Sequence, residues 1–178
     1  TYAQYCTSSG DASVDTGMTN VSFNTINNST PTNLAYTDFT SSQSTTVMQG
    51  YDYSISVNLN TDGPWTIYSL VWIDWDQNNL FDDGAYDLGT AYDNTDVATT
   101  LSGLPISVPM GATLGTTRMR VSSKYLNAPG SCEEGMDGEV EDYAIVVTAH
   151  VPVPEINIQG NGNSIVSGDI TPSALDDT

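Results

Sequence analysis

The chain has 178 residues with 22 acidic and only 3 basic side chains, which gives a formal net charge of −19 at pH 7. A surface of this sign repels nucleic acids and anionic membranes, because both are bound through patches of Lys and Arg. The length fits one domain with a short appendage, and no apolar run reaches the roughly 18 residues of a membrane span.

The chain is rich in Ser, Thr, Asn, Gly and Tyr, which is typical of a secreted all-β protein. Residues 1–10 form an extended lead-in. Val21–Ile26 alternates apolar and polar side chains, which predicts a half-buried strand, and Asn27–Pro31 predicts a turn. Tyr36–Phe39 is expected to be a short strand or corner, and the following residues 41–46 are polar.

The clearest strand is Tyr51–Leu59, whose alternate positions are apolar and place Tyr51 and Tyr53 among the core residues. A turn at Asn60–Pro64 leads into Trp65–Ile73, which is predicted to be a central strand.

The second half of the chain predicts further strands at Leu101–Val108, Arg118–Val121 and Glu139–Val147, after an acidic, aromatic excursion at residues 84–96. No segment shows the 3.6-residue period of a helix. About eight strands with turn signals every 8 to 12 residues predict an all-β fold, an antiparallel β-sandwich of jelly-roll or fibronectin-like order.

A change of composition divides the chain. We expect residues 1–149 to form the sandwich, and residues 150–178 to hold a Pro-rich linker and the truncated start of a following domain. No signal peptide is visible, so any leader or upstream domain would precede Thr1.

The central strand runs directly into a cluster of oxygen-bearing side chains. Asp74, Asp76 and Asn78 are spaced two apart, so their oxygens can converge on one point. Because Ca²⁺ takes six to eight oxygen ligands, we predict a calcium site, with a solvated acidic turn as the alternative. The predicted ligands are Asp74, Asp76, Asn78, the carbonyl of Leu80, Asp82 or Asp83, and a distant Glu139 or Asp142.

Two cysteines, Cys6 and Cys132, lie near the two ends of the predicted sandwich, and neither has a zinc-ligand motif around it. In an oxidising compartment the simplest arrangement is a disulfide between them. Two unrelated buried thiols remain the alternative.

The basic residues Arg118, Arg120 and Lys124 form one cluster in a very acidic chain. Arg118 and Arg120 share one face of a predicted strand, opposite the presumed core. They could clamp a sulfate or carboxylate of an acidic glycan. The alternative is an ion-pair ladder with acids of a neighbouring strand, namely Glu139, Glu141 or Asp142.

Several aromatic side chains in or next to polar loops could together form a platform that stacks on sugar rings: Trp65, Tyr68, Tyr86, Tyr92 and Tyr125. A half-buried ring with a wet polar tip is also ordinary, so each ring alone fits a structural role better than a ligand-binding one. Trp72 and Trp75 point opposite ways, and we expect one in the core and the other nearer the acidic loop.

The run Gly138-Glu139-Val140-Glu141-Asp142-Tyr143 on the last predicted strand resembles the GEVED domain family. Other motifs occur in that family's order and extend the resemblance to residues 1–148: Tyr5-Cys6, Tyr36–Thr40, Val71–Gln77 and Thr117–Val121. The family's loop has Gly where Asn79 stands here, and Asn tolerates the left-handed backbone that Gly would adopt.

This resemblance implies a non-catalytic β-sandwich carried by secreted, multidomain proteins of Bacteroidetes, attached to polysaccharide-degrading enzymes, metalloproteases or adhesins. Residues 154–162 are similar to the start of the Ig-like anchoring domains that follow in such proteins.

We therefore expect an extracellular, monomeric, calcium-stabilised carbohydrate-binding module that holds an attached catalytic domain against a marine or algal polysaccharide, sulfated ones included. A structural or protein-binding spacer without glycan affinity is the alternative. An enzyme comes third, because the single histidine, His150, lies at the exit of the last strand beside a Pro-rich linker.

Overall fold

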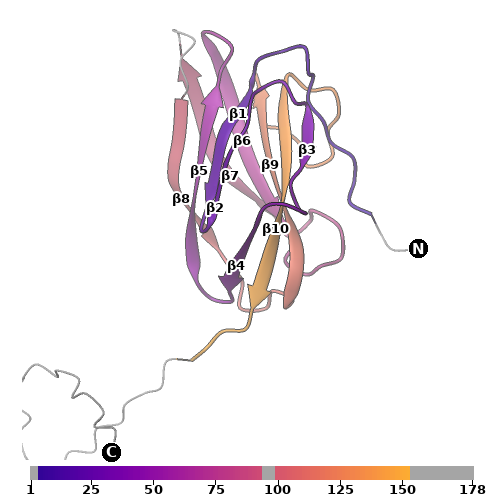
Figure 1. Cartoon of the computed structure of the whole chain (residues 1–178), viewed down its shortest axis with the longest axis vertical. Coiled ribbons are helices and arrows are strands. Elements are labelled where there is room, and N and C mark those ends of the chain that lie inside the picture. Colours follow the sequence, from indigo (N-terminus) through magenta and orange to yellow (C-terminus); the bar gives the residue numbers. More distant parts are fainter. Residues whose placement is uncertain (1–3, 94–98, 153–178) are drawn as a thin grey trace, which may run out of the picture.

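The computed structural model describes residues 4–93 and 99–152, which form two β-sheets packed face to face (Figure 1). The strands in these ranges are β1 (Gly17–Phe23), β2 (Ile26–Ser29), β3 (Tyr36–Asp38), β4 (Ser44–Met48), β5 (Asp52–Asn60), β6 (Trp65–Ile73), β7 (Ala85–Asp93), β8 (Thr99–Ser107), β9 (Gly115–Tyr125) and β10 (Gly138–Thr148). The predicted all-β sandwich is confirmed. Within the described ranges, no helix is long and apolar enough to cross a membrane.

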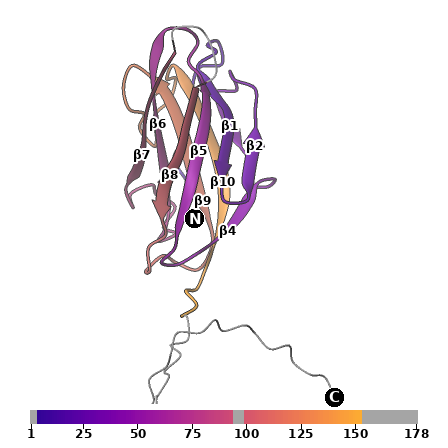
Figure 2. The same cartoon turned by 90° about the vertical axis from the view of Figure 1, so that its left-hand side faces the viewer.

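The two sheets differ in size and in strand direction. One has the order β2-β1-β5-β8 and the other the order β3-β10-β9-β6-β7, with β4 also paired to β10 (Figure 2). β10 is antiparallel to β9 but parallel to β3 and β4, which follow one another along its other edge. The larger sheet is therefore mixed, which corrects the prediction of a purely antiparallel sandwich.

The strands differ from the sequence prediction in several places. The predicted strand Val21–Ile26 is divided by a tight turn, because Asn24 adopts a left-handed φ of 51° and Phe23 pairs back onto Ile26. The residues predicted to form the next turn therefore belong largely to β2. β4 and β7 were not predicted as strands, since β4 is mostly polar and β7 is interrupted by Gly89, where its register against β6 shifts.

The core lies between the sheets and follows the alternation of the strands. Met119 and Val121 of β9 are fully buried in it, as predicted. Tyr53 is half-buried against the core, but Tyr51 precedes β5 and is 42% exposed. The assignment of Tyr51 to the core was wrong, because the strand begins one residue later.

The N-terminal segment crosses the outer face of the larger sheet and is fixed there covalently. The predicted disulfide between Cys6 and Cys132 is confirmed. The Ser9 amide donates to the Glu133 carbonyl at 3.0 Å. Gly10 lies so close to β10 that a Cβ would stand 1.6 Å from the carbonyl oxygen of Gly138, so only glycine fits at this crossing.

The predicted linker and domain start at residues 150–178 lie almost wholly outside the described residues, as do residues 94–96 of the predicted excursion and residues 1–3 of the lead-in.

Candidate functional site

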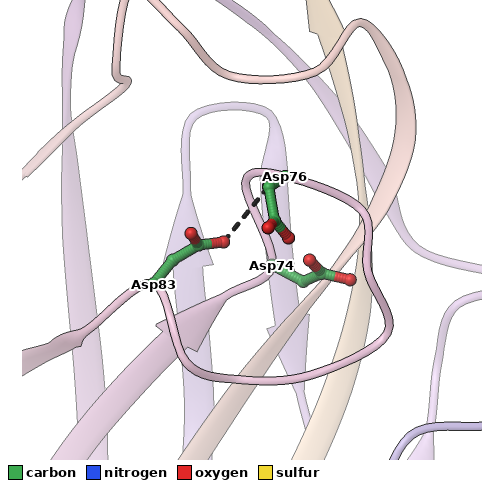
Figure 3. A group of neighbouring side chains, drawn as sticks. All are labelled: Asp74, Asp76 and Asp83. Carbon is green, nitrogen blue, oxygen red and sulfur yellow. Dashed lines mark hydrogen bonds between the residues drawn. The ribbon is translucent and has the colours of Figure 1, made fainter.

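Three carboxylates meet in the loop between β6 and β7. Asp74 follows the last residue of β6 and is fully buried, whereas Asp76 and Asp83 are exposed. One oxygen of each carboxylate lies within 4.8 Å of the others (Figure 3). Close carboxylate oxygens are the ligands that Ca²⁺ prefers, so these three residues are the ones that could hold the ion.

Backbone amides shape the loop around these acids. Asp74 accepts hydrogen bonds from the amides of Asn78 at 3.1 Å and Asn79 at 2.9 Å. Asp83 accepts from the amides of Trp75 at 2.6 Å and Asp76 at 3.1 Å. Asn79 has a φ of 67°, which confirms that it adopts the left-handed backbone. Burial raises the pKa of Asp74.

Two other predicted ligands, Asn78 and Asp82, form hydrogen bonds within the loop. The side-chain oxygen of Asn78 accepts from the Leu80 amide at 2.7 Å, and its side-chain amide donates to Asp76 at 3.0 Å and to Asp82 at 3.2 Å. Of the two alternative carboxylates, Asp83 joins the cluster and Asp82 does not.

The prediction that Glu139 or Asp142 completes the metal site was wrong. It assumed that the final strand lies beside β6, but β9 lies between them. Both oxygens of Asp142 bond to arginines. Glu139 points between the sheets, where it accepts from the Met18 amide at 2.8 Å.

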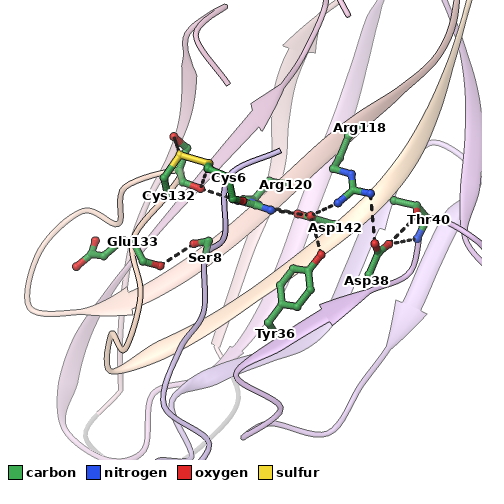
Figure 4. A network of polar contacts seen from close by, with 11 residues as sticks. Cys6, Ser8, Tyr36, Asp38, Thr40, Arg118, Arg120, Cys132, Glu133 and Asp142 are labelled. Atoms are coloured by element: carbon green, nitrogen blue, oxygen red, sulfur yellow. Dashed lines mark hydrogen bonds and ion pairs between the residues drawn. A yellow bond between two sulfur atoms is a disulfide. The ribbon is translucent and has the colours of Figure 1, made fainter. Parts of the chain in front are cut away.

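The basic cluster forms the ion-pair ladder that was the alternative to a glycan clamp (Figure 4). Arg120, whose side chain is 2% exposed, donates from Nε and Nη2 to the two oxygens of Asp142, each at 2.8 Å. Arg118 bonds to Asp142 at 2.8 Å and to Asp38 at 3.2 Å. Lys124 pairs with Glu133. Each basic side chain is thus already neutralised within the protein.

The remaining acids of the same strand face the interior. Alternation along β10 turns Asp142 outward and Glu139 and Glu141 inward, and both glutamates are fully buried. Glu141 accepts from the hydroxyls of Thr30 at 2.8 Å and Tyr143 at 2.6 Å. Among the described residues, no group bonds to Oε1 of Glu139. Burial, together with the Glu141 carboxylate, raises the pKa of Glu139 to about 8.

Comparison with protein families adds an independent observation. Residues 68–146 match the GEVED domain. The chain carries a GEVED domain. The match spans most of β6 through most of β10 and includes the whole Gly138–Tyr143 run. The match is shorter than the expected range of residues 1–148, and it leaves out the Tyr5-Cys6 and Tyr36–Thr40 motifs.

No curated protein matches the sequence. Among solved structures, a Niemann-Pick type C2 protein from Japanese carpenter ant has a TM-score of 0.47 and 5% identity, over 82% of this chain and 98% of that one. The Pseudomonas fluorescens alkylpurine DNA glycosylase AlkC, bound to DNA containing an abasic site analog, has a TM-score of 0.38 and 9% identity, over 56% of this chain and 27% of that one. Neither similarity bears on function.

The GEVED domain does not bring the predicted aromatic platform together. Tyr68 and Tyr92 share the outer face of neighbouring strands, because Tyr68 pairs with Thr90 and Thr66 with Tyr92. Trp65 lies at the same end of β6, and its ring packs edge-on against Tyr125 with centroids 5.4 Å apart. Tyr92 is 59% exposed and Trp65 is 46% exposed.

Tyr86, Trp72 of β6 and Trp75 of the loop are structural residues of the GEVED domain. The Tyr86 hydroxyl donates to the Ser107 carbonyl and accepts from Trp75 Nε1, both at 3.0 Å. Trp72 and Trp75 are both buried, on opposite faces of the sheet. Trp75 belongs to the core cluster although it stands in the loop, and Trp72 lies outside that cluster, so the expected division into one core residue and one nearer the loop was wrong.

His150 is half-buried at the end of β10, with Nδ1 3.2 Å from the Gln49 carbonyl oxygen and its ring 5.9 Å from the ring of Tyr51. Three residues that were not singled out for function gather instead around Arg118, namely Tyr5, Tyr36 and Asp38. The signal that could have found them is their place in two of the motifs noted above.

Proposed function

We propose that this GEVED domain is a non-catalytic, calcium-stabilised carbohydrate-binding module of an extracellular protein, which holds an attached catalytic domain against a polysaccharide. The observation that carries the proposal is the pair of tyrosines, Tyr68 and Tyr92, on one outer sheet face. We call these two residues the aromatic strip. Rings that keep an apolar face in water suit the C–H faces of sugars.

The charge distribution favours a neutral polysaccharide over a sulfated one. All three basic side chains are paired with carboxylates, and the chain has a net charge of −19. An anionic glycan would meet long-range repulsion with no unpaired cation to offset it.

The covalent link between Cys6 and Cys132 supports the extracellular assignment. Disulfides form and persist in oxidising compartments and are rare in the cytosol.

The proposed calcium ion has a structural role. Asp74 lies six positions beyond Tyr68 and eight beyond Thr66, the partner of Tyr92, so about 20 to 26 Å separates it from the aromatic strip at the usual rise of a strand. An ion held by Asp74, Asp76 and Asp83 would offset their mutual repulsion and fix the loop. It would not touch a sugar on the aromatic strip.

A structural spacer is the second candidate, and the contact between Trp65 and Tyr125 favours it. The packing of Trp65 on Tyr125 explains the position of both rings without a ligand. The two functions differ in glycan retention and agree in calcium dependence.

Calcium is expected to raise the thermal stability of the domain. At a concentration 100 times its dissociation constant, an ion that binds only the folded state adds about 2.7 kcal/mol, which we would measure as a shift of Tm in calorimetry with calcium and with a chelator. Asp83→Asn should abolish the shift, and Asp52→Asn, at an exposed acid of β5, should retain it. Equal Tm values in calcium and chelator would contradict the metal site.

Tyr92→Ala is expected to weaken retention on immobilised neutral polysaccharides at least tenfold, since it removes the most exposed ring of the aromatic strip. Affinity electrophoresis across a panel of neutral and sulfated gels measures this. The matched control is Tyr51→Ala, at a tyrosine that is 42% exposed and lies outside the strip. If no gel retards the wild-type protein, the spacer function is the correct one.

A further inference from the structure

A cleft of about 690 Å³ opens on the outer face of the larger sheet, between the N-terminal segment, β3 and the acidic loop. Its volume lies in the range of small-molecule sites. Tyr5, Tyr36, Asp38, Asn79 and Arg118 are among the residues that line it. None of them belongs to the aromatic strip.

Arg118 and Asp38 supply the polar groups of the cleft. The side chain of Arg118 is 22% exposed and that of Asp38 is 40% exposed, so both can reach a ligand without leaving their ion pair. A guanidinium has five N–H donors. Nη1 of Arg118 donates one to Asp142 and Nη2 donates one to Asp38. Arg118 can donate hydrogen bonds and the Asp38 carboxylate can accept them. Together they match two neighbouring hydroxyls of a sugar, because each hydroxyl both donates and accepts.

Two tyrosine rings flank these groups. The guanidinium of Arg118 lies 4.8 Å from the ring centroid of Tyr5. The Tyr5 hydroxyl is held by Asp74 at 2.5 Å, and the Tyr36 hydroxyl donates to Asp142 at 3.0 Å. Both rings are therefore fixed in place before any ligand arrives, which lowers the ordering cost of binding.

We propose that this cleft is a sugar subsite, separate from the aromatic strip, in which Arg118 and Asp38 bind adjacent hydroxyls of one neutral sugar unit. The inference rests on the proposed function, because it assumes a glycan ligand. We expect the bound sugar unit to be neutral, because the charges of Arg118 and Arg120 are already balanced by Asp38 and Asp142.

The two arginines make the subsite directly observable. They are the only arginines in the chain, so the Nε–Hε region of a ¹⁵N NMR spectrum holds two signals, and Arg118→Lys identifies one by its loss. We would titrate the protein with neutral methyl glycosides and with soluble oligosaccharides of the same sugars. The Arg118 signal should shift on binding, and it should shift more than the signal of Arg120, which also lines the cleft but whose side chain is only 2% exposed.

Asp38→Ala should weaken this binding at least tenfold while leaving the Arg118–Asp142 pair intact, and Asp52→Ala should keep the affinity within twofold. A stationary Arg118 signal, or an Asp38→Ala variant that binds like wild type, would overturn the subsite. If the signal is stationary while Tyr92→Ala still abolishes polysaccharide retention, the subsite fails and the proposed function stands. If no polysaccharide is retained and the Arg118 signal is stationary, the subsite and the proposed function both fail.

Discussion

Replacing Asp142 with alanine is expected to cost about 3–5 kcal/mol of unfolding free energy, the range found when one partner of a buried ion pair is removed. Both oxygens of Asp142 are used by Arg118 and Arg120, and the side chain of Asp142 is fully buried. The substitution leaves Arg120 buried without its counter-ion, so the full desolvation penalty of that charge appears.

Urea unfolding followed by circular dichroism measures this loss. Asp38→Ala is the matched control, because Asp38 stands at the solvent-exposed end of the same ladder and exposed ion pairs contribute about 0–1 kcal/mol. A loss of less than about 1 kcal/mol for Asp142→Ala would show that Arg120 finds other partners, such as the Ser131 and Cys6 carbonyls that it already contacts.

Stability conferred by Glu139 is expected to fall as the pH rises. Its folded-state pKa is about 8, against an ordinary value of 4.5, because it is buried and faces the Glu141 carboxylate. The folded state therefore holds a proton that the unfolded state has released. The stabilisation that this proton gives the folded state is complete below about pH 4.5 and is lost as the pH approaches 8. Between these values the unfolding free energy falls by about 1.4 kcal/mol per pH unit.

The test compares unfolding free energies of wild type and Glu139→Gln between pH 5 and pH 8. Glutamine keeps an acceptor for the Met18 amide but does not titrate, so the difference between the two proteins should change steadily across this window. Glu134→Gln, at an exposed glutamate that follows Glu133 in the same loop, should give a curve parallel to wild type. Parallel curves for Glu139→Gln would mean that Glu139 is ionised in the folded protein.

Local patterns in the sequence predicted those features that depend on neighbouring residues. Alternation in β9 placed Met119 and Val121 in the core and both arginines outside it, and Asn79 was expected to adopt a left-handed backbone. The oxygen spacing of the β6–β7 loop brought Asp74 and Asp76 together. All of these follow from strand period or from loop geometry over a few residues.

Features that depend on strand order could not be predicted in this way. The wrong metal ligands, Glu139 and Asp142, followed from placing β10 beside β6 when β9 lies between them. The inward direction of Glu139 and Glu141 follows from the same alternation that turns Asp142 outward, but two buried acids contradict the usual rule that carboxylates face water. Tyr5 reaches Asp74 across 69 positions of sequence, and no local pattern reports such a contact.

The disulfide also determines how the domain would carry a mechanical load. Cys6 and Cys132 are 126 positions apart, so a pull on the N-terminal segment passes through the sulfur atoms and bypasses β1 to β9. The tension then runs only along the segment from Cys132 through β10. That strand is hydrogen-bonded along both edges, to β9 on one side and to β3 and β4 on the other. A domain pulled between its two ends would thus place the strain on its best-held strand and keep the rest of the sandwich unstretched.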